Sequence, residues 1–314
     1  TGAQVQILLD DQSVEQFVPF TIRSGQTLSI GKTTNGLRCY LLIDGGIEAT
    51  QYLGSSATFS LAGFGGLSGK SLAGGNVLSF AAPRSENVDT EDPMVSVDSL
   101  DLSQRYKVRV LVGPHTAPEF ITEEGFRSLF TTEWLVDHNS SRTGVRLLGP
   151  KIEWARENGG EAGLHPSNIH DNAYAFGALD MTGDTPILLG PDGPSLGGFV
   201  SPAVVINADR WKLGQLCPGD RVSLEAVSEE EARNLSDQQE SLLHGRVSAN
   251  NVSNPVKGRS AFDSPVLWMK ESETKINVRR SGQEWLLVEF GEPVLDLSSR
   301  VAVERLVKFI EDDN

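Results

Sequence analysis

The segment between residues 159 and 202 concentrates side chains that can bind a small polar molecule. Two histidines, an asparagine and an aspartate lie within seven positions of one another: His165, Asn168, His170 and Asp171. Nine glycines in the same segment leave much of its backbone uncovered. Apart from the run 186–190, the segment lacks the periodicity of apolar residues that an element built for packing shows. The pattern indicates a segment that places polar groups and bare backbone around something small.

Two familiar kinds of site can be sought among these residues, a metal centre and a serine nucleophile. His165, His170 and Asp171 do not have a standard spacing of zinc ligands, so we expect no metal site. The run 193–197, Gly-Pro-Ser-Leu-Gly, matches the G-x-S-x-G pattern around Ser195. That pattern requires a helix after the serine, whereas two glycines and a β run follow here. We therefore do not expect a serine hydrolase.

Some of the polar residues also have a structural interpretation. His165 stands before Pro166, where it can cap a turn as readily as it can bind a ligand. Asp180 and Asp184 flank Thr182 and Gly183, which are typical of a hairpin turn. We interpret both aspartates as turn residues and leave the two interpretations of His165 open.

The elements that must position these side chains are predicted to be mostly short strands, with a few short helices. Apolar runs between Gly, Asp and Asn turns predict strands at Val5–Leu9, Phe17–Ile22, Thr27–Ile30, Arg38–Ile43, Val77–Phe80, Tyr106–Val112, Trp134–His138, Arg146–Leu148, Ile187–Leu189, Phe199–Ile206, Ile276–Arg280 and Trp285–Phe290. Capping residues predict helices at Glu119–Phe130, with Thr122 as N-cap, and at Ser228–Leu243, with Ser228 as N-cap. A further helix is expected from about Ser298 to Glu311.

Composition excludes two classes of partner. The chain has 314 residues and a net charge of −15, which argues against a nucleic-acid-binding surface. No apolar run approaches the roughly 20 residues that a membrane span needs. Cys39 and Cys217 have no metal-ligand spacing, and we expect them to be buried free thiols in a reducing compartment. A cytoplasmic protein without nucleic-acid or membrane partners is therefore expected.

Six short landmarks occur in the order in which a known family has them. They are residues 36–41 (GLRCYL), 53–58 (LGSSAT), 63–66 (GFGG), 142–150 (RTGVRLLGP), 163–168 (GLHPSN) and 191–198 (PDGPSLGG). Through them the chain resembles the allophanate hydrolase subunit 2 family, and within it the carboxyltransferase region of biotin-dependent urea carboxylases and urea amidolyases. The resemblance covers about residues 1–225. Residues 280–292, RSGQEWLLVEFGE, are similar to the start of the companion subunit 1 family.

The resemblance implies a mainly β fold of cyclophilin-like β-barrels, with a site between two halves. It also implies a reaction in which carboxybiotin passes its carboxyl group to a urea nitrogen to give allophanate. Biotin would be carried by a separate carboxyl carrier domain, and ATP would be used by a separate biotin carboxylase domain. The expected partners are urea, these two domains and a subunit 1-like half. We expect the isolated chain to fold but to show little or no carboxylation.

This implied chemistry assigns one group of residues to biotin. The ureido oxygen that biotin exposes after losing its carboxyl group needs hydrogen-bond donors, and backbone N–H groups of glycine are well suited. We select Gly193, Gly197 and Gly198 for this role, with Ser195 as a further donor. Arg142 is a candidate for binding a carboxylate.

A second group of residues is assigned to urea, which presents four N–H donors and one acceptor. We select Asp171 and Asn168 to face the donors, with His165 and His170 beside them. The ureido oxygen can take the urea proton, so no separate protein base is required. Tyr174 is a candidate donor to the biotin or urea carbonyl, although a buried barrel tyrosine is equally expected.

We expect three segments: residues 1–225 as the subunit 2-like carboxyltransferase subdomain, 226–275 as a helix and linker, and 276–314 as a truncated start of a subunit 1-like subdomain. Residues 268–271, WMKE, would then lie in a linker and not form a biotin-accepting motif. Two alternatives remain, a related component of ATP-dependent 5-oxoprolinase and a non-catalytic regulatory binding module. The sequence does not distinguish urea from guanidine as acceptor.

Overall fold

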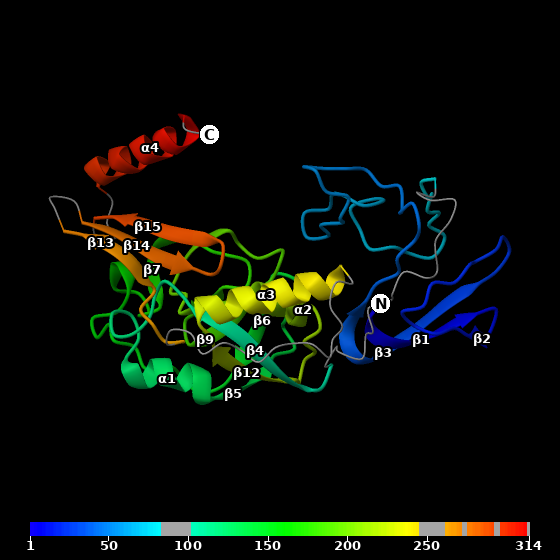
Figure 1. Cartoon of the computed structure of the whole chain (residues 1–314), viewed down its shortest axis with the longest axis horizontal. Helices are drawn as coiled ribbons and strands as arrows, with labels where there is room; N and C mark the ends of the chain where they lie inside the picture. Colours follow the sequence, from blue (N-terminus) through cyan, green and yellow to red (C-terminus); the bar gives the residue numbers. More distant parts are fainter. Residues whose placement is uncertain (83–101, 245–260, 272–274, 292–295, 313–314) are drawn as a thin grey trace. The chain divides into compact units, whose positions relative to one another are not determined.

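The computed structural model describes residues 1–82, 102–244, 261–271, 275–291 and 296–312. The chain forms two compact units, and Figure 1 shows their elements. The first unit contains Thr1–Lys32 and Cys39–Met94, and the second contains Thr33–Arg38 and Val95–Asn314. The fold is mainly β, which confirms the predicted class. This division differs from the expected boundaries near residues 225 and 275, which stay a prediction.

The first unit is organised around a three-stranded sheet in the order β2-β1-β3. Its strands are β1 (Gly2–Leu9), β2 (Gln12–Ser13) and β3 (Leu28–Cys39), and residues 33–38 of β3 belong to the second unit. Gln16 holds β1 from one side, since its amide donates to Ala3 O at 2.8 Å and accepts from Val5 N at 3.3 Å. The predicted strand Val5–Leu9 is confirmed within β1.

Several strand predictions in the first unit are wrong. Residues 17–22 form no strand, and Val18, Phe20 and Ile22 are exposed. The strand expected from residue 38 to 43 ends at Cys39, and the one expected at residues 77–80 is reduced to a single bridge at Phe80. An apolar run makes a strand only where a partner strand and a buried face are available, and residues 17–22 have no strand partner among the described residues and are mostly exposed.

The second unit contains a seven-stranded sheet that nearly closes into a barrel. Its strand order is β11-β4-β12-β5-β6-β9-β8. Ala178, just before β8, forms a bridge with Val204 in β11 and so joins the two ends of the sheet. The strands are β4 (Arg105–Val112), β5 (Glu133–Val136), β6 (Gly144–Leu148), β8 (Leu179–Thr182), β9 (Thr185–Leu189), β11 (Ala203–Val205) and β12 (Arg221–Ala226). Fully buried side chains such as Trp134, Val108 and Leu179 fill its interior.

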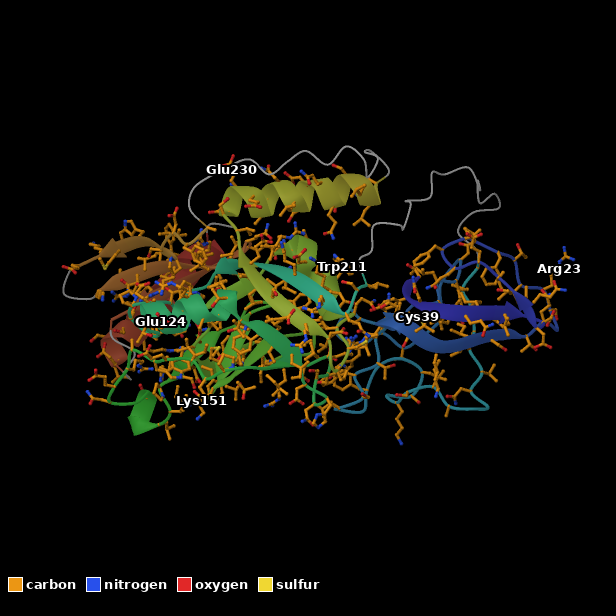
Figure 2. All side chains as sticks on the ribbon, turned by 90° about the horizontal axis from the view of Figure 1, so that it is seen from below. Arg23, Cys39, Glu124, Lys151, Trp211 and Glu230 are labelled. Atoms are coloured by element: carbon orange, nitrogen blue, oxygen red, sulfur yellow. The ribbon has the colours of Figure 1, made fainter. Side chains whose placement is uncertain are left out.

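The two capping signals in the sequence are confirmed. Helix α1 (Glu123–Thr131) begins after Thr122, whose hydroxyl accepts from Gly125 N at 3.0 Å. Helix α3 (Glu229–Leu243) begins after Ser228, whose hydroxyl accepts from Glu231 N at 3.2 Å. Glu124 and Glu230, labelled in Figure 2, lie in the first turns, where negative charge favours the helix dipole. The remaining helices are η2 (Glu161–Gly163), η3 (Asn207–Asp209), α2 (Arg210–Leu213) and α4 (Leu297–Asp312).

The glycine-rich segment contains more β structure than its sequence predicts. Strand β7 (Asn168–Ala173) pairs only with β10 (Leu196–Phe199) as a two-stranded antiparallel ribbon. Strands β8 and β9 form a hairpin around residues 183–184, which confirms the turn predicted there. Apolar and polar residues alternate along a strand when one whole face of its sheet is buried, and neither face of this ribbon is. For this reason β7 and β10 were not predicted from the periodicity of apolar residues.

The C-terminal elements pack against the barrel. Strands β13 (Val266–Lys270), β14 (Ile276–Ser281) and β15 (Trp285–Phe290) form an antiparallel sheet. Arg279 in β14 is 5% exposed and binds Glu119 and Glu289. The expectation that residues 268–271 lie in a linker is wrong, because Trp268, Met269 and Lys270 belong to β13 and pair with β14.

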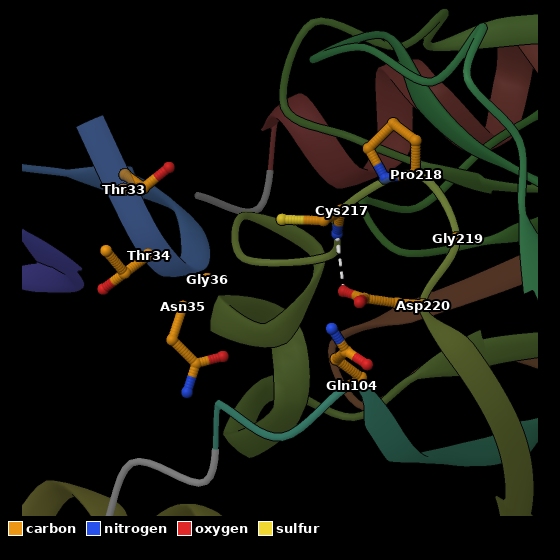
Figure 3. A pocket seen from close by; sticks show the side chains of 9 residues that line it. All are labelled: Thr33, Thr34, Asn35, Gly36, Gln104, Cys217, Pro218, Gly219 and Asp220. Carbon is orange, nitrogen blue, oxygen red and sulfur yellow. Dashed lines mark hydrogen bonds between the residues drawn. The ribbon is translucent and has the colours of Figure 1, made fainter.

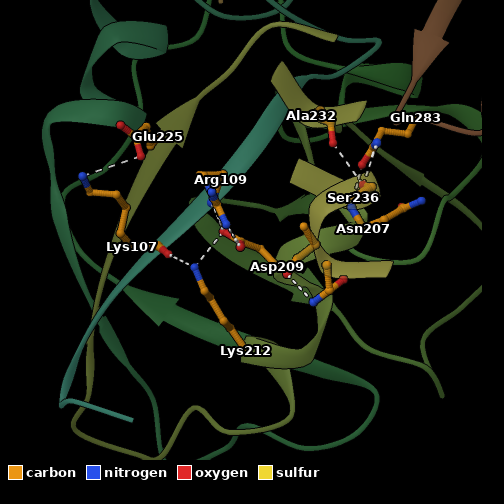
Figure 4. A network of polar contacts seen from close by, with 11 residues as sticks. Lys107, Arg109, Asn207, Asp209, Lys212, Glu225, Ala232, Ser236 and Gln283 are labelled. Carbon is orange, nitrogen blue, oxygen red and sulfur yellow. Dashed lines mark hydrogen bonds and ion pairs between the residues drawn. The ribbon is translucent and has the colours of Figure 1, made fainter. Parts of the chain in front are cut away.

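A buried polar network fixes the helical turns η3 and α2 against β4 (Figure 4). Asp209 is fully buried and accepts from Arg109 Nη2 at 2.6 Å, Arg109 Nε at 3.0 Å and Arg109 N at 2.8 Å. Lys212 Nζ lies 2.9 Å from the same carboxylate. On the other side of η3, Asn207 N donates to Gln283 Oε1 at 2.6 Å, which ties the C-terminal sheet to this turn.

Among the described helices, none is long and apolar enough to cross a membrane.

Candidate functional site

The β7–β10 ribbon presents two of the predicted site residues from a bulge. Asn172 pairs with Gly197, and Asn168 pairs with Phe199. Residues 169–171 of β7 therefore face a single residue of β10, Gly198. Bulges interrupt the alternation of a strand and can direct neighbouring side chains to the same side. Consistent with this, His170 and Asp171 are both exposed although they are consecutive.

Two glycines make this geometry possible. A Cβ on Gly198 would lie 2.9 Å from Ile169 O, and a Cβ on Gly197 would lie 2.8 Å from the Tyr174 ring. Both distances are shorter than real Cβ contacts, so neither position accepts a side chain without movement. The sequence prediction selected these glycines as N–H donors, and the structure shows in addition that β7 and Tyr174 approach their backbones closely.

Tyr174 lies beside the ribbon with its hydroxyl on the backbone of Phe199. The hydroxyl accepts from Phe199 N at 2.7 Å and donates to Phe199 O at 3.0 Å. Burial, followed by the charge of Asp180, raises the pKa of Tyr174 above its usual value. The tyrosine is therefore neutral at physiological pH and holds its proton as a hydrogen-bond donor.

Asp180 on β8 completes this arrangement. Its carboxyl group is 5% exposed and lies near the hydroxyl groups of Tyr174 and Thr182. Burial raises the pKa of Asp180 to about 6, although these hydroxyl groups favour the ionised form. The sequence analysis interpreted Asp180 as a turn residue and missed this contact. Its position two residues before Thr182 in a buried strand was the available signal, because it predicts an inward-facing carboxyl group.

Some buried polar atoms near the ribbon are unpaired. Asn172 is 5% exposed, and within the described residues neither atom of its side-chain amide has a hydrogen-bond partner. Asp180 Oδ1 is also buried without one among these residues. A buried donor or acceptor without a hydrogen-bond partner lowers the stability of the fold, so these atoms are candidates for contacts to a further molecule.

His165 belongs to a different cluster of contacts. Its Nδ1 accepts from Ser167 N at 3.2 Å, and its Nε2 lies 3.3 Å from Asp184 Oδ1. Burial opposes ionisation of Asp184, but hydrogen bonds from Lys151 and Trp154 outweigh it and lower the pKa of this carboxyl group. Nδ1 caps the turn at Ser167, as the structural interpretation of His165 expects. A catalytic role of His165 stays a prediction.

Asn168 joins the start of β7 to the neighbouring loop through its backbone. Its N–H donates to His165 O at 2.8 Å, and its carbonyl accepts from Arg156 Nη1 at 2.6 Å. The structure thus brings Asn168, His170 and Asp171 together on one strand, opposite Gly198 and Phe199.

Arg142 and Gly193 lie in the loops around β6 and before β10. Arg142 binds Asp192 through two hydrogen bonds of 2.6 and 2.9 Å, and this contact lowers the pKa of Asp192. Gly193 N donates to Gly190 O at 3.0 Å, so this N–H is engaged within the turn. Ser195 is exposed, and its carbonyl accepts from Tyr174 N at 2.9 Å. The roles of Arg142, Gly193 and Ser195 in biotin binding stay predictions.

A polar cavity of about 290 Å³ lies at another place in the second unit (Figure 3), lined by Thr33, Thr34, Asn35, Gly36, Gln104, Cys217, Pro218, Gly219 and Asp220. Asp220 Oδ2 accepts from Cys217 N at 2.7 Å. Burial and then the charge of Asp220 raise the pKa of the Cys217 thiol, which makes it a poor nucleophile. Both cysteines are free, as expected, but they are half-buried and not fully buried.

In the part of the chain that the structure describes, no three His, Cys, Asp or Glu side chains gather in a way that could hold a metal ion.

These features define a class of protein: a mainly β chain with a nearly closed barrel-like sheet and a glycine-rich ribbon that presents polar side chains. Residues 1–226 match the family model described as "Carboxyltransferase domain, subdomain A and B". The chain belongs to this family.

Relatives match the chain far beyond this family region. It is 38% identical to the urea amidolyase of Saccharomyces cerevisiae over 99% of its own length and 17% of that protein. The crystal structure of the Kluyveromyces lactis urea carboxylase is 37% identical, with a TM-score of 0.90 over 100% of this chain and 29% of that one. A 5-oxoprolinase component of Haemophilus influenzae is more distant, at 28% identity over 77% of this chain and 73% of that protein. The chain thus spans 17% to 29% of the length of the two yeast proteins.

Proposed function

We propose that this chain is the carboxyltransferase part of a biotin-dependent urea carboxylase and transfers a carboxyl group from carboxybiotin to urea to give allophanate. The observation that carries the proposal is similarity to urea amidolyase over nearly the whole chain, at 38% identity. The match to the 5-oxoprolinase component supports the same family but is more distant. The expected carboxyltransferase subdomain at 1–225 and the segments 226–275 and 276–314 would act together with a subunit 1-like half, a biotin carrier and a biotin carboxylase.

The ribbon has groups that suit both reactants. Urea and the ureido ring of biotin each present N–H donors next to a carbonyl acceptor. The exposed Asp171 carboxylate can accept from urea, while the side-chain amide of Asn172 has a donor and an acceptor without partners among the described residues. Gly197 and Gly198 offer backbone that no side chain covers. These residues therefore fit the chemical groups that the proposed reaction brings together.

In the proposed mechanism, Asp171 accepts hydrogen bonds from urea and orients one urea nitrogen for attack, with Asn168 and His170 beside it. The backbone at Gly197 and Gly198 stabilises negative charge on the ureido oxygen. Biotin, if held at Gly197 and Gly198, would supply the carboxyl group, exchanging the bond between the carboxyl carbon and the biotin nitrogen for a bond to the urea nitrogen, and it would take up the proton that urea loses.

The test is urea-dependent allophanate formation by the full-length parent enzyme, compared between wild type and Asp171→Ala. Biotin carboxylation is followed separately in the same preparations. Asp237→Ala, an exposed aspartate on α3, is the matched control. We expect Asp171→Ala to carboxylate biotin normally and to lose at least about 90% of the allophanate formation, and Asp237→Ala to change neither, because one well-oriented contact supplies about tenfold or more.

Three results would contradict parts of the proposal. Undiminished transfer in Asp171→Ala would remove Asp171 from the site. A wild-type enzyme that ignores urea would refute the acceptor, and guanidine would be tested next. Carboxylation of urea by the present chain alone, with only ATP and free biotin, would refute its dependence on other domains.

A further inference from the structure

The bulge in β7 has little support from strand pairing. Residues 169–171 oppose Gly198 alone, so this part of β7 has fewer pairing partners than a regular ladder supplies. Bulges lacking support from elsewhere can shift by a residue, which would exchange the side chains that they present. A contact outside the ladder is therefore needed at β10.

Tyr174 supplies such a contact. It follows β7 directly, and its hydroxyl reaches along β10 to both backbone groups of Phe199, at 2.7 and 3.0 Å. Next to Phe199, Val200 N donates to Ser167 O at 2.9 Å, which resumes the ladder on the other side of the bulge. The two contacts fix β10 at the point where the bulge ends.

The position of the tyrosine is itself fixed from two sides. Its ring lies against the bare backbone of Gly197, where a Cβ would come within 2.8 Å of Cε2 and 3.3 Å of the hydroxyl. The buried Asp180 carboxyl group approaches the same hydroxyl from β8. The tyrosine thus lies between the ribbon and the barrel sheet.

We propose that Tyr174 is a positioning residue, whose hydroxyl fixes the backbone of Phe199 and so holds the bulge that presents His170 and Asp171. The effect on carboxyl transfer rests on the function proposed above, whereas the effect on the backbone does not. This role differs from the direct hydrogen bond to a biotin or urea carbonyl that the sequence predicts for Tyr174, because here the tyrosine acts through Phe199.

The first test needs no activity. In this chain, single-residue amide hydrogen exchange is measured for wild type and Tyr174→Phe. We expect the Phe199 amide to exchange at least about tenfold faster and the NMR signals of His170 and Asp171 to shift, while the Met181 amide, which donates to Val200 O at 3.0 Å, exchanges as before. Unchanged exchange at Phe199 or unchanged signals at His170 and Asp171 would overturn the proposal.

The matched control is Tyr106→Phe. Tyr106 is also buried, at 4% exposed, but lies on β4 in the barrel core. The substitution removes the same hydroxyl group without touching the ribbon. Equal effects of the two variants on Phe199 exchange would show that general loosening, and not the Tyr174 contact, is responsible.

The second test measures allophanate formed per biotin carboxylated in the full-length parent enzyme. We expect Tyr174→Phe to lower this ratio about 10- to 100-fold, because displacement of a reacting group by about 1 Å can cost about 100-fold. Tyr106→Phe should leave it unchanged, and an unchanged ratio in Tyr174→Phe would overturn the positioning role. If the wild type makes no allophanate, the proposed function fails, and the exchange experiment still decides whether Tyr174 holds the bulge.

Gly197→Ala provides an independent variant. Its methyl group would displace the Tyr174 ring, so the Phe199 amide should again exchange faster. If both substitutions act through the same contact, the Gly197→Ala and Tyr174→Phe double variant should exchange no faster than the stronger single variant. Additive effects would contradict the shared contact.

Discussion

Arg279→Gln should weaken the docking of the C-terminal sheet on the barrel. The Arg279 side chain is 6% exposed and donates from Nε to Glu289 at 2.6 Å. Its Nη1 lies 2.9 Å from Glu119 Oε2 and donates to Pro114 O at 3.2 Å. It therefore joins β14 to the loop before α1. A glutamine has a neutral amide and cannot make these contacts together.

The expected magnitude follows from the exposure of each partner. Glu119 is 54% exposed and can regain water, so its contact contributes at most about 1 kcal/mol. Glu289 lies on β15 of the same sheet, so the hydrogen bond to it stabilises the sheet internally and does not contribute to docking. The Pro114 carbonyl adds about 1 kcal/mol. We expect Arg279→Gln to lower the free energy of docking the C-terminal sheet by about 2 kcal/mol.

Limited proteolysis under native conditions measures this docking directly, since cleavage within β13–β15 requires local opening. Cleavage there should accelerate about 10- to 30-fold in Arg279→Gln, while the barrel core stays resistant. Arg300→Gln on α4 is the control, because its pair with Glu304 is exposed on both sides and contributes at most about 0.5 kcal/mol. A cleavage rate within about threefold of wild type in Arg279→Gln would refute the reasoning, since it would mean that the buried contacts hold little of the sheet in place.

Three further outcomes can be measured on the same chain. Burial, and then the charges of Arg279 and Arg156, lower the pKa of His115 to about 3, and NMR titration of Arg279→Gln should show a raised His115 pKa. Because the unfolded state binds a proton near pH 6.5 and the folded state does not, the free energy of unfolding should fall as pH falls from about 6.5 toward 3. Asp209→Ala should cost about 3–5 kcal/mol in guanidinium denaturation, because it removes the buried carboxylate that the partly buried Arg109 and Lys212 share. A loss below about 1 kcal/mol would contradict this. Asp220→Asn removes a charge that raises the pKa of Cys217, so alkylation of this thiol by iodoacetamide at about pH 7.5 should become faster; a slower reaction would contradict the electrostatic account.

Local signals in the sequence predicted local structure well. Thr122 and Ser228 were identified as helix caps from their residue types and the acidic residues after them, and both hydroxyls accept the expected backbone N–H. The turn at Gly183 was likewise predicted from its dipeptide. In these cases a few neighbouring residues determine the structure.

Features that depend on distant residues were not predicted. Phe17–Ile22 has the composition of a strand, but no other strand among the described residues pairs with it. For the site, the polar residues around Asp171 were recognised as candidates by composition. The bulge that presents them depends on the pairing of β7 with β10, about 25 residues later in the chain. The hydrogen bonds of Tyr174 also require β10, and no local pattern predicts that contact.

The bulge has a consequence for how the acceptor preference of such proteins can change during evolution. Because residues 169–171 oppose Gly198 alone, deletion or insertion of one residue here would leave the pairs Asn172–Gly197 and Asn168–Phe199 in register. In a regular strand the same event would turn every later side chain to the opposite face. Relatives that use another acceptor would therefore be expected to differ here in loop length as well as in residue type. Under the function proposed above, the ribbon would combine a fixed frame with a short stretch of chain that can vary, and a new acceptor could be accommodated there at little cost to folding.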